Sequence, residues 1–163
     1  MDREILFRGK RSDTQEWVEG YYVKRHGVPI IYENAECPQS NYEVQEETLC
    51  KCAGLIAGKE IWENYICLWV DSAYGKCTGV VRYGEWEQDG SGGEYGVTKC
   101  LGWYLEVTKV QSLMPDVYTD AEAEEIYPEW WRTISLVDAA KEMSDFAVIG
   151  NIFDNPELLK EYE

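Results

Sequence analysis

Residues 65–70 read YICLWV, a continuous apolar run of strand length, and this run decides the class of fold. Such a run, bounded by turn signals, is typical of a buried strand. Two more aromatic and β-branched runs follow, GVVRYGEWE at residues 79–87 and CLGWYLEVTKV at residues 100–110, with the loop QDGSGGEYG between them. Short strands joined by glycine-rich turns predict a small barrel or sandwich. We expect a bent barrel like that of Src-homology 3 (SH3) domains over residues 51–111.

The stretch before this centre also has strand character. REILFRG at residues 3–9 and EWVEGYYVK at residues 16–24 are separated by turn-forming residues, which predicts an N-terminal hairpin. GVPIIYE at residues 27–33 is a candidate third strand, and its Pro29 indicates a strand start or a position near an edge. Residues 34–48 are expected to form a loop with one short strand. Residues 1–50 should therefore be an N-terminal β part.

After residue 111 the pattern changes to helix. Thr119 and Glu122 have the spacing of a capping box, and Pro128 limits the length of the helix that follows. Ser135 and Asp138 form a second pair of this kind. Apolar residues follow it at helical spacing: Leu136, Ala140, Met143 and Ala147. We therefore predict a helical insert over residues 112–145.

The last part, residues 146–163, predicts a closing strand and a terminal helix. In FAVIGNIFDNPELL, Gly150 would allow a bulge, and Asn155 would cap a helix that begins at Pro156. Leu158 and Leu159 would pack that helix on the sheet. A chain of 163 residues fits one domain, which we expect to be mainly β with α-helical additions, an α+β fold.

The net charge of −16 is unevenly distributed. Residues 1–25 carry +1, residues 26–111 carry −7 and residues 112–163 carry −10. An acidic body repels phosphate backbones, so any nucleic-acid contact would need the basic cluster near the N-terminus. The members of that cluster are Arg3, Arg8, Lys10, Arg11, Lys24 and Arg25.

The compartment is inferred from what the sequence lacks. The N-terminus, MDREILFRGKR, has charges where a signal peptide needs an apolar core, and no run approaches the length of a membrane span. We expect no membrane association and a cytoplasmic protein in a bacterial host cell. The six cysteines are then expected to be reduced, buried thiols.

Three stretches together resemble the YopX-like family of phage and prophage proteins. They are REILFRGKR with EWVEGYYV near the start, AGLIAGKEIWENYI at residues 53–66, and VIGNIFDNPELL at residues 148–159. The chain departs from the family's middle motif at Trp62, where the family has Tyr, and at Asn64 and Tyr65, which replace Gly-Asp. The resemblance implies a β-rich fold, an accessory role in phage or prophage biology and, by analogy, contact with nucleic acid.

No motif assigns a catalytic, cofactor or metal site. Cys50, Cys52, Cys67 and Cys77 lack the two Cys-x-x-Cys pairs of a structural zinc site. The single histidine, His26, reads as a turn residue with no selected cysteine partner. The glycine-rich loop at residues 88–96 lacks the Lys-Ser/Thr of a phosphate loop. The carboxylates of DAEAEEIYPE, residues 120–129, are those of a solvated helix face.

The tryptophans divide into core and interface candidates. Trp62, Trp69 and Trp103 sit inside apolar runs, which predicts core packing. Trp130 and Trp131 are adjacent, so they cannot both be buried against one face of a single helix or strand. We therefore take Trp130 and Trp131 as candidate interface residues, since large aromatic side chains are enriched at interfaces.

Three functions are compatible with these sequence features. The first is a non-enzymatic phage or prophage accessory protein that binds a host or phage protein and forms a homo-oligomer through strand edges and surplus aromatics. The second is nucleic-acid binding through the N-terminal hairpin, with Arg8, Lys10, Arg11, Lys24 and Arg25 as the contact residues. The third is an acidic DNA mimic that inhibits a host protein.

Overall fold

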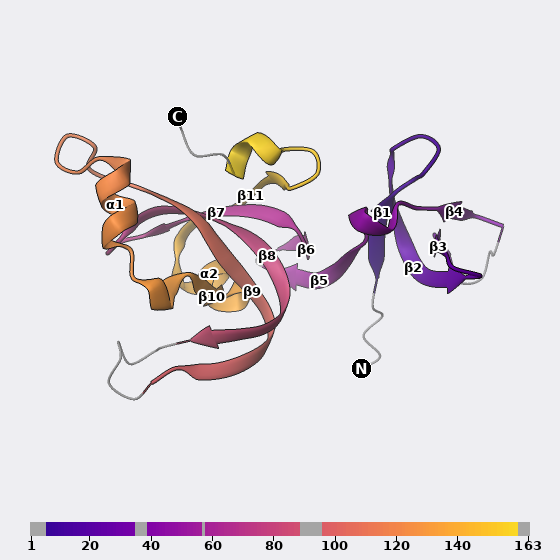
Figure 1. The fold of residues 1–163 in the computed structure, drawn as a ribbon, viewed down its shortest axis with the longest axis horizontal. Coiled ribbons are helices and arrows are strands. Elements are labelled where there is room, and N and C mark those ends of the chain that lie inside the picture. The colour runs from indigo at the N-terminus through magenta and orange to yellow at the C-terminus, as the bar shows by residue number, and fades with distance from the viewer. Residues whose placement is uncertain (1–5, 35–38, 57, 89–95, 160–163) are drawn as a thin grey trace. The chain divides into compact units, whose positions relative to one another are not determined.

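The computed structural model describes residues 6–34, 39–56, 58–88 and 96–159. It is mainly β, with two antiparallel sheets and two short α-helices, which confirms the α+β class (Figure 1). The chain divides into two compact units. The first comprises Met1–Gly54 and Glu60–Trp62, and the second comprises Leu55–Lys59 and Glu63–Glu163.

The first unit is built on a six-stranded sheet. Its strands are β1 (Phe7–Lys10), β2 (Trp17–Arg25), β3 (Val28–Tyr32), β4 (Asn41–Glu43), β5 (Cys50–Ile56) and β6 (Lys59–Trp62), in the order β4-β3-β2-β1-β5-β6. The predicted hairpin is confirmed: β1 and β2 pair antiparallel with Phe7 opposite Gly20 and Lys10 opposite Trp17. Between β4 and β5 lies a 3-10 turn, Glu46–Thr48.

A small apolar core holds this sheet together. Val18, Ile31 and Val44 are buried, and Phe7, Tyr42 and Leu49 pack against them. Pro29 is the second residue of β3, which agrees with a strand start. The expected short strand within residues 34–48 is β4, which pairs with β3. β4 and not β3 therefore forms this edge of the sheet.

The second unit contains a five-stranded sheet in the order β10-β9-β8-β7-β11. Its strands are β7 (Tyr65–Asp71), β8 (Gly75–Gln88), β9 (Thr98–Gln111), β10 (Thr133–Ser135) and β11 (Ser144–Asn151). β7, β8 and β9 are the three runs that decide the fold class in the sequence, and all three are strands. Their buried side chains include Ile66, Trp69, Val80, Val81 and Leu105.

Two short helices join these strands. α1 (Asp120–Ile126) begins at the predicted capping box: the Thr119 side chain accepts from the Glu122 amide, and the Glu122 carboxylate accepts from the Thr119 amide at 2.7 Å. α2 (Leu136–Glu142) begins at Ser135, whose hydroxyl accepts from the Asp138 amide. Besides these helices, residues 112–145 contain a 3-10 turn (Glu129–Trp131) and β10, which pairs with β9.

The second helix is shorter than its apolar spacing predicts. α2 ends at Glu142, Met143 closes it, and Ala147 lies in β11 opposite Leu68 of β7. The chain returns to the sheet at Ser144 because pairing with β7 satisfies the backbone that a longer helix would have used. Neither α1 nor α2, at seven residues each, is long or apolar enough to cross a membrane, and the remaining described segments contain no longer helix.

The closing motif differs in detail from its prediction. β11 has the expected irregularity at Gly150, where its register with β7 shifts. The Asn155 side-chain oxygen does not cap a helix; it accepts from the Asn151 amide at 3.3 Å. The next residues form a 3-10 turn, Pro156–Leu159, in which Leu158 and Leu159 are half-buried. A loop closed by Asn151 and Asn155 therefore occupies the place of the predicted cap.

The core predictions for tryptophan are correct at two of three positions. Trp62 and Trp69 are buried, but Trp103 is half-buried and contacts Tyr83, with 5.0 Å between ring centres. Trp86, which lay outside the predicted core, is buried instead and stacks with Tyr104. Trp103 lies beyond the stretch of β9 that β10 covers, so its apolar run is not enclosed by a third strand.

Candidate functional site

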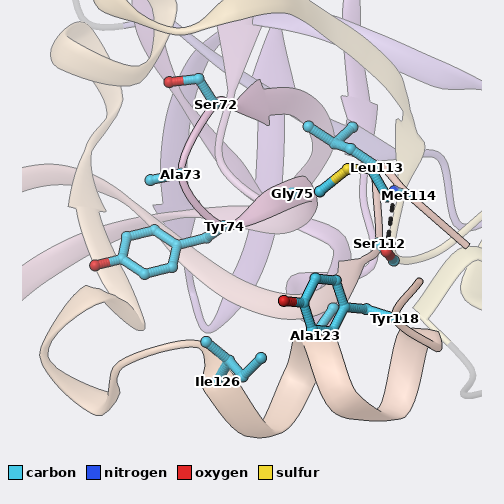
Figure 2. Close-up of a pocket in the computed structure, with 10 residues that line it drawn as sticks. All are labelled: Ser72, Ala73, Tyr74, Gly75, Ser112, Leu113, Met114, Tyr118, Ala123 and Ile126. Atoms are coloured by element: carbon cyan, nitrogen blue, oxygen red, sulfur yellow. Dashed lines mark hydrogen bonds between the residues drawn. The ribbon is translucent and has the colours of Figure 1, made fainter.

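An apolar hollow in the second unit is the candidate site. It has a volume of about 210 Å³ and opens between the β7–β8 turn, the segment after β9, and α1. Figure 2 shows the residues that line it, with Ile126 projecting from α1 toward the turn that carries Tyr74. The lining residues are Ser72, Ala73, Tyr74, Gly75, Ser112, Leu113, Met114, Tyr118, Ala123 and Ile126.

The turn on one side of the hollow is fixed by Asp71. This carboxylate is buried and accepts the amide hydrogens of Ala73 at 2.8 Å and Tyr74 at 3.3 Å. An Asp that bonds to the backbone two and three residues on holds a tight turn in one conformation. The Tyr74 ring then packs on Tyr127, with 5.4 Å between ring centres, and on Trp131 at 5.9 Å. This wall is therefore preformed.

Hydrogen bonds to the end of β9 fix α1 on the other side. The Glu124 carboxylate accepts the Val110 amide hydrogen at 2.7 Å and also pairs with the Arg132 guanidinium. The Asp120 carboxylate accepts the Ser112 amide hydrogen at 3.0 Å. Because two carboxylates of one short helix hold backbone amides of the same strand end, α1 has a defined position beside β9.

The rim of the hollow carries exposed apolar side chains. Met114 is 56% exposed and Ile126 is 58% exposed, and Leu113, Val117 and Tyr118 are exposed as well. Only Ala123 among the lining residues of α1 is buried. Four of these side chains line the hollow, namely Leu113, Met114, Tyr118 and Ile126. Exposed apolar side chains that are grouped in this way mark a site for a partner more often than an ordinary surface does.

The chain segment that carries these exposed apolar side chains is acidic. Residues 112–131 contain six acidic residues and no Lys or Arg. Asp120, Glu122 and Glu124 are used in the internal bonds of α1. Asp116, Glu125 and Glu129 make no hydrogen bond or ion pair within the described residues. An apolar hollow thus lies next to a chain segment whose negative charge is not neutralised within the described residues.

The sequence did not point to this hollow. Leu113, Met114 and Val117 have neither strand nor helix periodicity in SLMPDVY, and Ile126 reads as part of a buried helix face. The available signal was a group of apolar residues flanking Pro115 with no regular element to bury them. Residues 112–118 belong to no strand or helix, so no regular element buries these side chains.

Behind the hollow lies a group of buried, neutral polar side chains. The Tyr127 hydroxyl donates to the Trp131 carbonyl at 3.0 Å, and burial raises the pKa of this tyrosine. Burial and the nearby Asp71 charge raise the pKa of Cys77 to about 12. Both groups therefore remain protonated near neutral pH, and their contribution is to packing between β8 and the 3-10 turn at Glu129.

The candidate nucleic-acid residues lie in the first unit, and Arg8 is the least accessible of them. Arg8 is 6% exposed, and its guanidinium lies 4.1 Å from the ring centre of Trp17 and 5.6 Å from that of Trp62. A guanidinium within about 6 Å of an indole ring centre makes a favourable cation–π contact. Here those contacts hold β1 against β2 and β6, away from any surface that a phosphate could reach.

The other basic residues are partly neutralised. Arg11 pairs with Asp13 at 2.7 Å and lies over the Tyr42 ring, and Lys24 pairs with Glu46. The Asp13 carboxylate raises the pKa of Arg11, and Glu46 raises the pKa of Lys24. Lys10 lies over the Trp17 ring at 5.4 Å.

The structure does not bring all five basic residues together. Lys10 lies opposite Trp17 at the start of β2, whereas Lys24 and Arg25 end that strand. Arg25 is eight positions further along the strand than Trp17, which is at most about 26 Å at about 3.3 Å per residue. Arg8, Lys10 and Arg11 thus form one group, and Lys24 and Arg25 form another.

The two interface candidates belong to the 3-10 turn at Glu129–Trp131. The Trp131 side chain is half-buried and packs on Tyr74, and its carbonyl accepts from Tyr127. The Trp130 side chain lies outside the part of the structure that is described. Trp131 therefore supports the wall of the hollow.

The cysteines and His26 form no metal centre among the described residues, where no group of three His, Cys, Asp or Glu side chains could hold an ion. The prediction of buried thiols is confirmed for Cys50, Cys67 and Cys77 and is wrong for Cys52 and Cys100, which are half-buried. The sixth cysteine, Cys37, lies outside the described residues. His26 lies in the β2–β3 turn, as predicted, with a φ of +50°. A scan against protein-family models, a search of curated proteins and a search of solved structures each found no match.

Proposed function

We propose that this chain is a non-enzymatic binding module that docks another protein at the apolar hollow. The observation that carries the proposal is the preformed hollow itself, whose lining exposes Met114, Ile126 and two further large apolar side chains. Rigid walls reduce the entropy lost on binding, and apolar burial supplies the driving force.

The proposal includes the finer expectations from the sequence. We place the chain with the YopX-like proteins of phages and prophages, as an accessory protein of the bacterial cytoplasm with an SH3-like bent barrel in its centre. The support is the set of three sequence motifs at residues 3–23, 53–66 and 148–159, of which the terminal VIGNIFDNPELL is the most specific. A binding role agrees with an accessory protein, which acts through the proteins it contacts.

We also propose self-association, through side chains outside the hollow and not through strand edges. The edge strands β4 and β10 have three residues each, the edge strand β6 has four, and the edge strand β11 has two register shifts. Short and bulged edges discourage pairing with another strand. Light scattering over a range of micromolar concentrations tests this part, and a monomer throughout would remove it.

Selection from a random peptide library tests the docking function. The full chain serves as bait, and a Met114→Asp/Ile126→Asp variant serves for counter-selection. Both side chains are exposed, so the variant should keep its fold, which circular dichroism and thermal unfolding would verify. We expect peptides with bulky apolar residues that bind the wild type and not the variant.

A matched control distinguishes binding at this site from non-specific hydrophobic binding. Leu101 lies on β9, also in the second unit, and is 72% exposed. Leu101→Asp should bind the selected peptides as the wild type does. The proposal fails if no peptide is enriched, or if the enriched peptides bind the double variant as tightly as the wild type.

A further inference from the structure

We propose that the partner segment at the apolar hollow is basic and amphipathic: one or two bulky apolar side chains enter the hollow, and flanking Lys or Arg side chains face Asp116 and Glu125. This inference rests on the proposed docking function and adds the chemistry of the partner.

The size of the hollow favours side chains over a small-molecule ligand. Its volume of about 210 Å³ lies below the roughly 300–1,000 Å³ of sites that enclose drug-sized ligands. The polar groups needed to orient such a ligand are also few, since Ser72 and Ser112 supply the only side-chain hydroxyls besides those of the two tyrosines. An anchor of one or two apolar side chains matches both features.

The negative charge near the hollow indicates which residues of the partner should flank its apolar anchor. Asp116 and Glu125 are exposed and have no partner within the described residues, and Val117 and Ile126, their neighbours in sequence, are exposed apolar residues. A cation brought near them meets no competing Lys or Arg from residues 112–131. Electrostatic attraction of this kind speeds encounter and excludes acidic partners.

The same charge disfavours the other occupants. A second copy of this chain would bring another molecule of net charge −16 to the acidic segment beside the hollow. Nucleic acid would bring phosphates to the same carboxylates. Among macromolecules that could cover an apolar patch, a basic protein segment is favoured both by the apolar lining of the hollow and by the neighbouring carboxylates.

Three labelled peptides provide the test. Each has about 15 residues, enough for a helix to form on binding, with Leu at helical spacing, and the remaining positions are Lys, Gln or Glu. Binding to the full chain is followed by fluorescence anisotropy at about 0.05 M and about 0.3 M salt, where screening differs strongly.

We expect the Lys peptide to bind about tenfold more tightly than the Gln peptide at low salt, since a few exposed ion pairs contribute this much together. The advantage should shrink at high salt, and the Glu peptide should not bind. Asp116→Asn/Glu125→Gln should weaken the Lys peptide to the level of the Gln peptide. The control Glu85→Gln/Glu142→Gln removes two exposed carboxylates elsewhere in the second unit and should leave binding unchanged.

The outcomes distinguish failure of the basic-partner inference from failure of the proposed docking function. Equal binding of the Lys and Gln peptides, lost in both cases on Met114→Asp/Ile126→Asp, overturns the basic partner and keeps the docking site. Equal weakening by the two carboxylate variants also overturns the inference, because the attraction would come from overall charge. If Met114→Asp/Ile126→Asp affects no peptide, the docking site itself is wrong.

Discussion

The Glu124 carboxylate accepts the Val110 amide hydrogen at 2.7 Å and thereby attaches α1 to the end of β9. Val110 lies beyond Glu106, the last residue of β9 with a partner in β10, so Glu124 takes the place of a strand partner on this side. The same carboxylate pairs with Arg132 at the start of β10. One side chain thus joins three elements around the hollow.

Replacing Glu124 should destabilise the second unit. Glu124→Ala leaves the Val110 amide without its acceptor, and an unsatisfied buried group costs about 1–3 kcal/mol of unfolding free energy. Glu125→Ala is the matched control: it removes the neighbouring exposed carboxylate and should change stability by less than about 0.5 kcal/mol. Urea denaturation measures both. Equal stability of the two variants would contradict the role assigned to Glu124.

Glu19 should make the first unit more stable when it is neutral. Partial desolvation and the charge of Glu60 raise its pKa above the usual 4.5, although Arg8 opposes this shift. Because the pKa of Glu19 is raised in the folded state, ionisation of this carboxyl reduces the free energy of unfolding. This cost is absent below the unfolded-state pKa and develops as the pH rises through the folded-state pKa. Glu19→Gln should therefore stabilise the chain at pH 7 and make no difference below about pH 4.

Urea midpoints at the two pH values measure this effect. Glu60→Gln provides an independent check, because it removes the repulsion and should recover part of the gain at pH 7. If Glu19→Gln destabilises the chain at pH 7, the attraction to Arg8 dominates and the predicted direction is wrong.

The thiols should react in an order set by burial. Burial raises the pKa of both Cys67 and Cys77 to about 12, so almost no thiolate forms at pH 8. Cys52 and Cys100 are half-buried and should be alkylated by iodoacetamide in the native protein before Cys67 and Cys77 are. Mass spectrometry locates each modification. Native-state labelling of Cys67 at the rate of Cys52 would mean that the second unit opens readily.

Nucleic acid should bind weakly or not at all at physiological salt. Arg8 is buried, and Arg11 and Lys24 are paired with carboxylates. Anisotropy of labelled single- and double-stranded DNA and RNA, at low and physiological salt, measures this. Saturable binding that survives physiological salt and falls on Lys10→Ala/Arg11→Ala would restore the nucleic-acid function. Arg8→Ala is unsuitable for that purpose, because losing the stack on Trp17 should destabilise the fold.

Gly150 should tolerate no side chain while Asn155 is present. A Cβ at Gly150 would lie 2.5 Å from the Asn155 side-chain oxygen. Gly150→Ala should therefore destabilise the chain strongly in the wild type and less in an Asn155→Ala background. Thermal unfolding of the double-mutant cycle measures the difference. Additive effects would show that the two residues do not constrain each other.

Local signals predicted the local structure well. The capping box at Thr119 and the apolar run of β7 depend on neighbours in sequence, and both appear where expected. Arg8 was misplaced on the surface because a charged residue in a strand usually points to solvent. Its burial depends on Trp17 and Trp62, and nothing local reveals that Trp62 returns to that sheet.

The candidate site was the least predictable part. The hollow requires that the turn at Tyr74 and the helix at Ile126 meet, although about fifty residues of chain separate them. Strand pairing between β7, β8 and β9 creates that meeting, and the pairing partners cannot be read from periodicity alone. The sequence did reveal the acidic character of residues 112–163, and the carboxylates near the hollow belong to this part of the chain.

The path of the chain between the two units limits how the protein can be divided. Leu55–Lys59 belongs to the second unit, whereas Glu60–Trp62 returns to the first. A fragment that stops at Gly54 would lack Ile61 and Trp62, both fully buried, and with them the second indole that contacts Arg8. The first unit can therefore not be isolated by a single cut, and a truncation at Gly54 would report misfolding of that unit where it is meant to locate function.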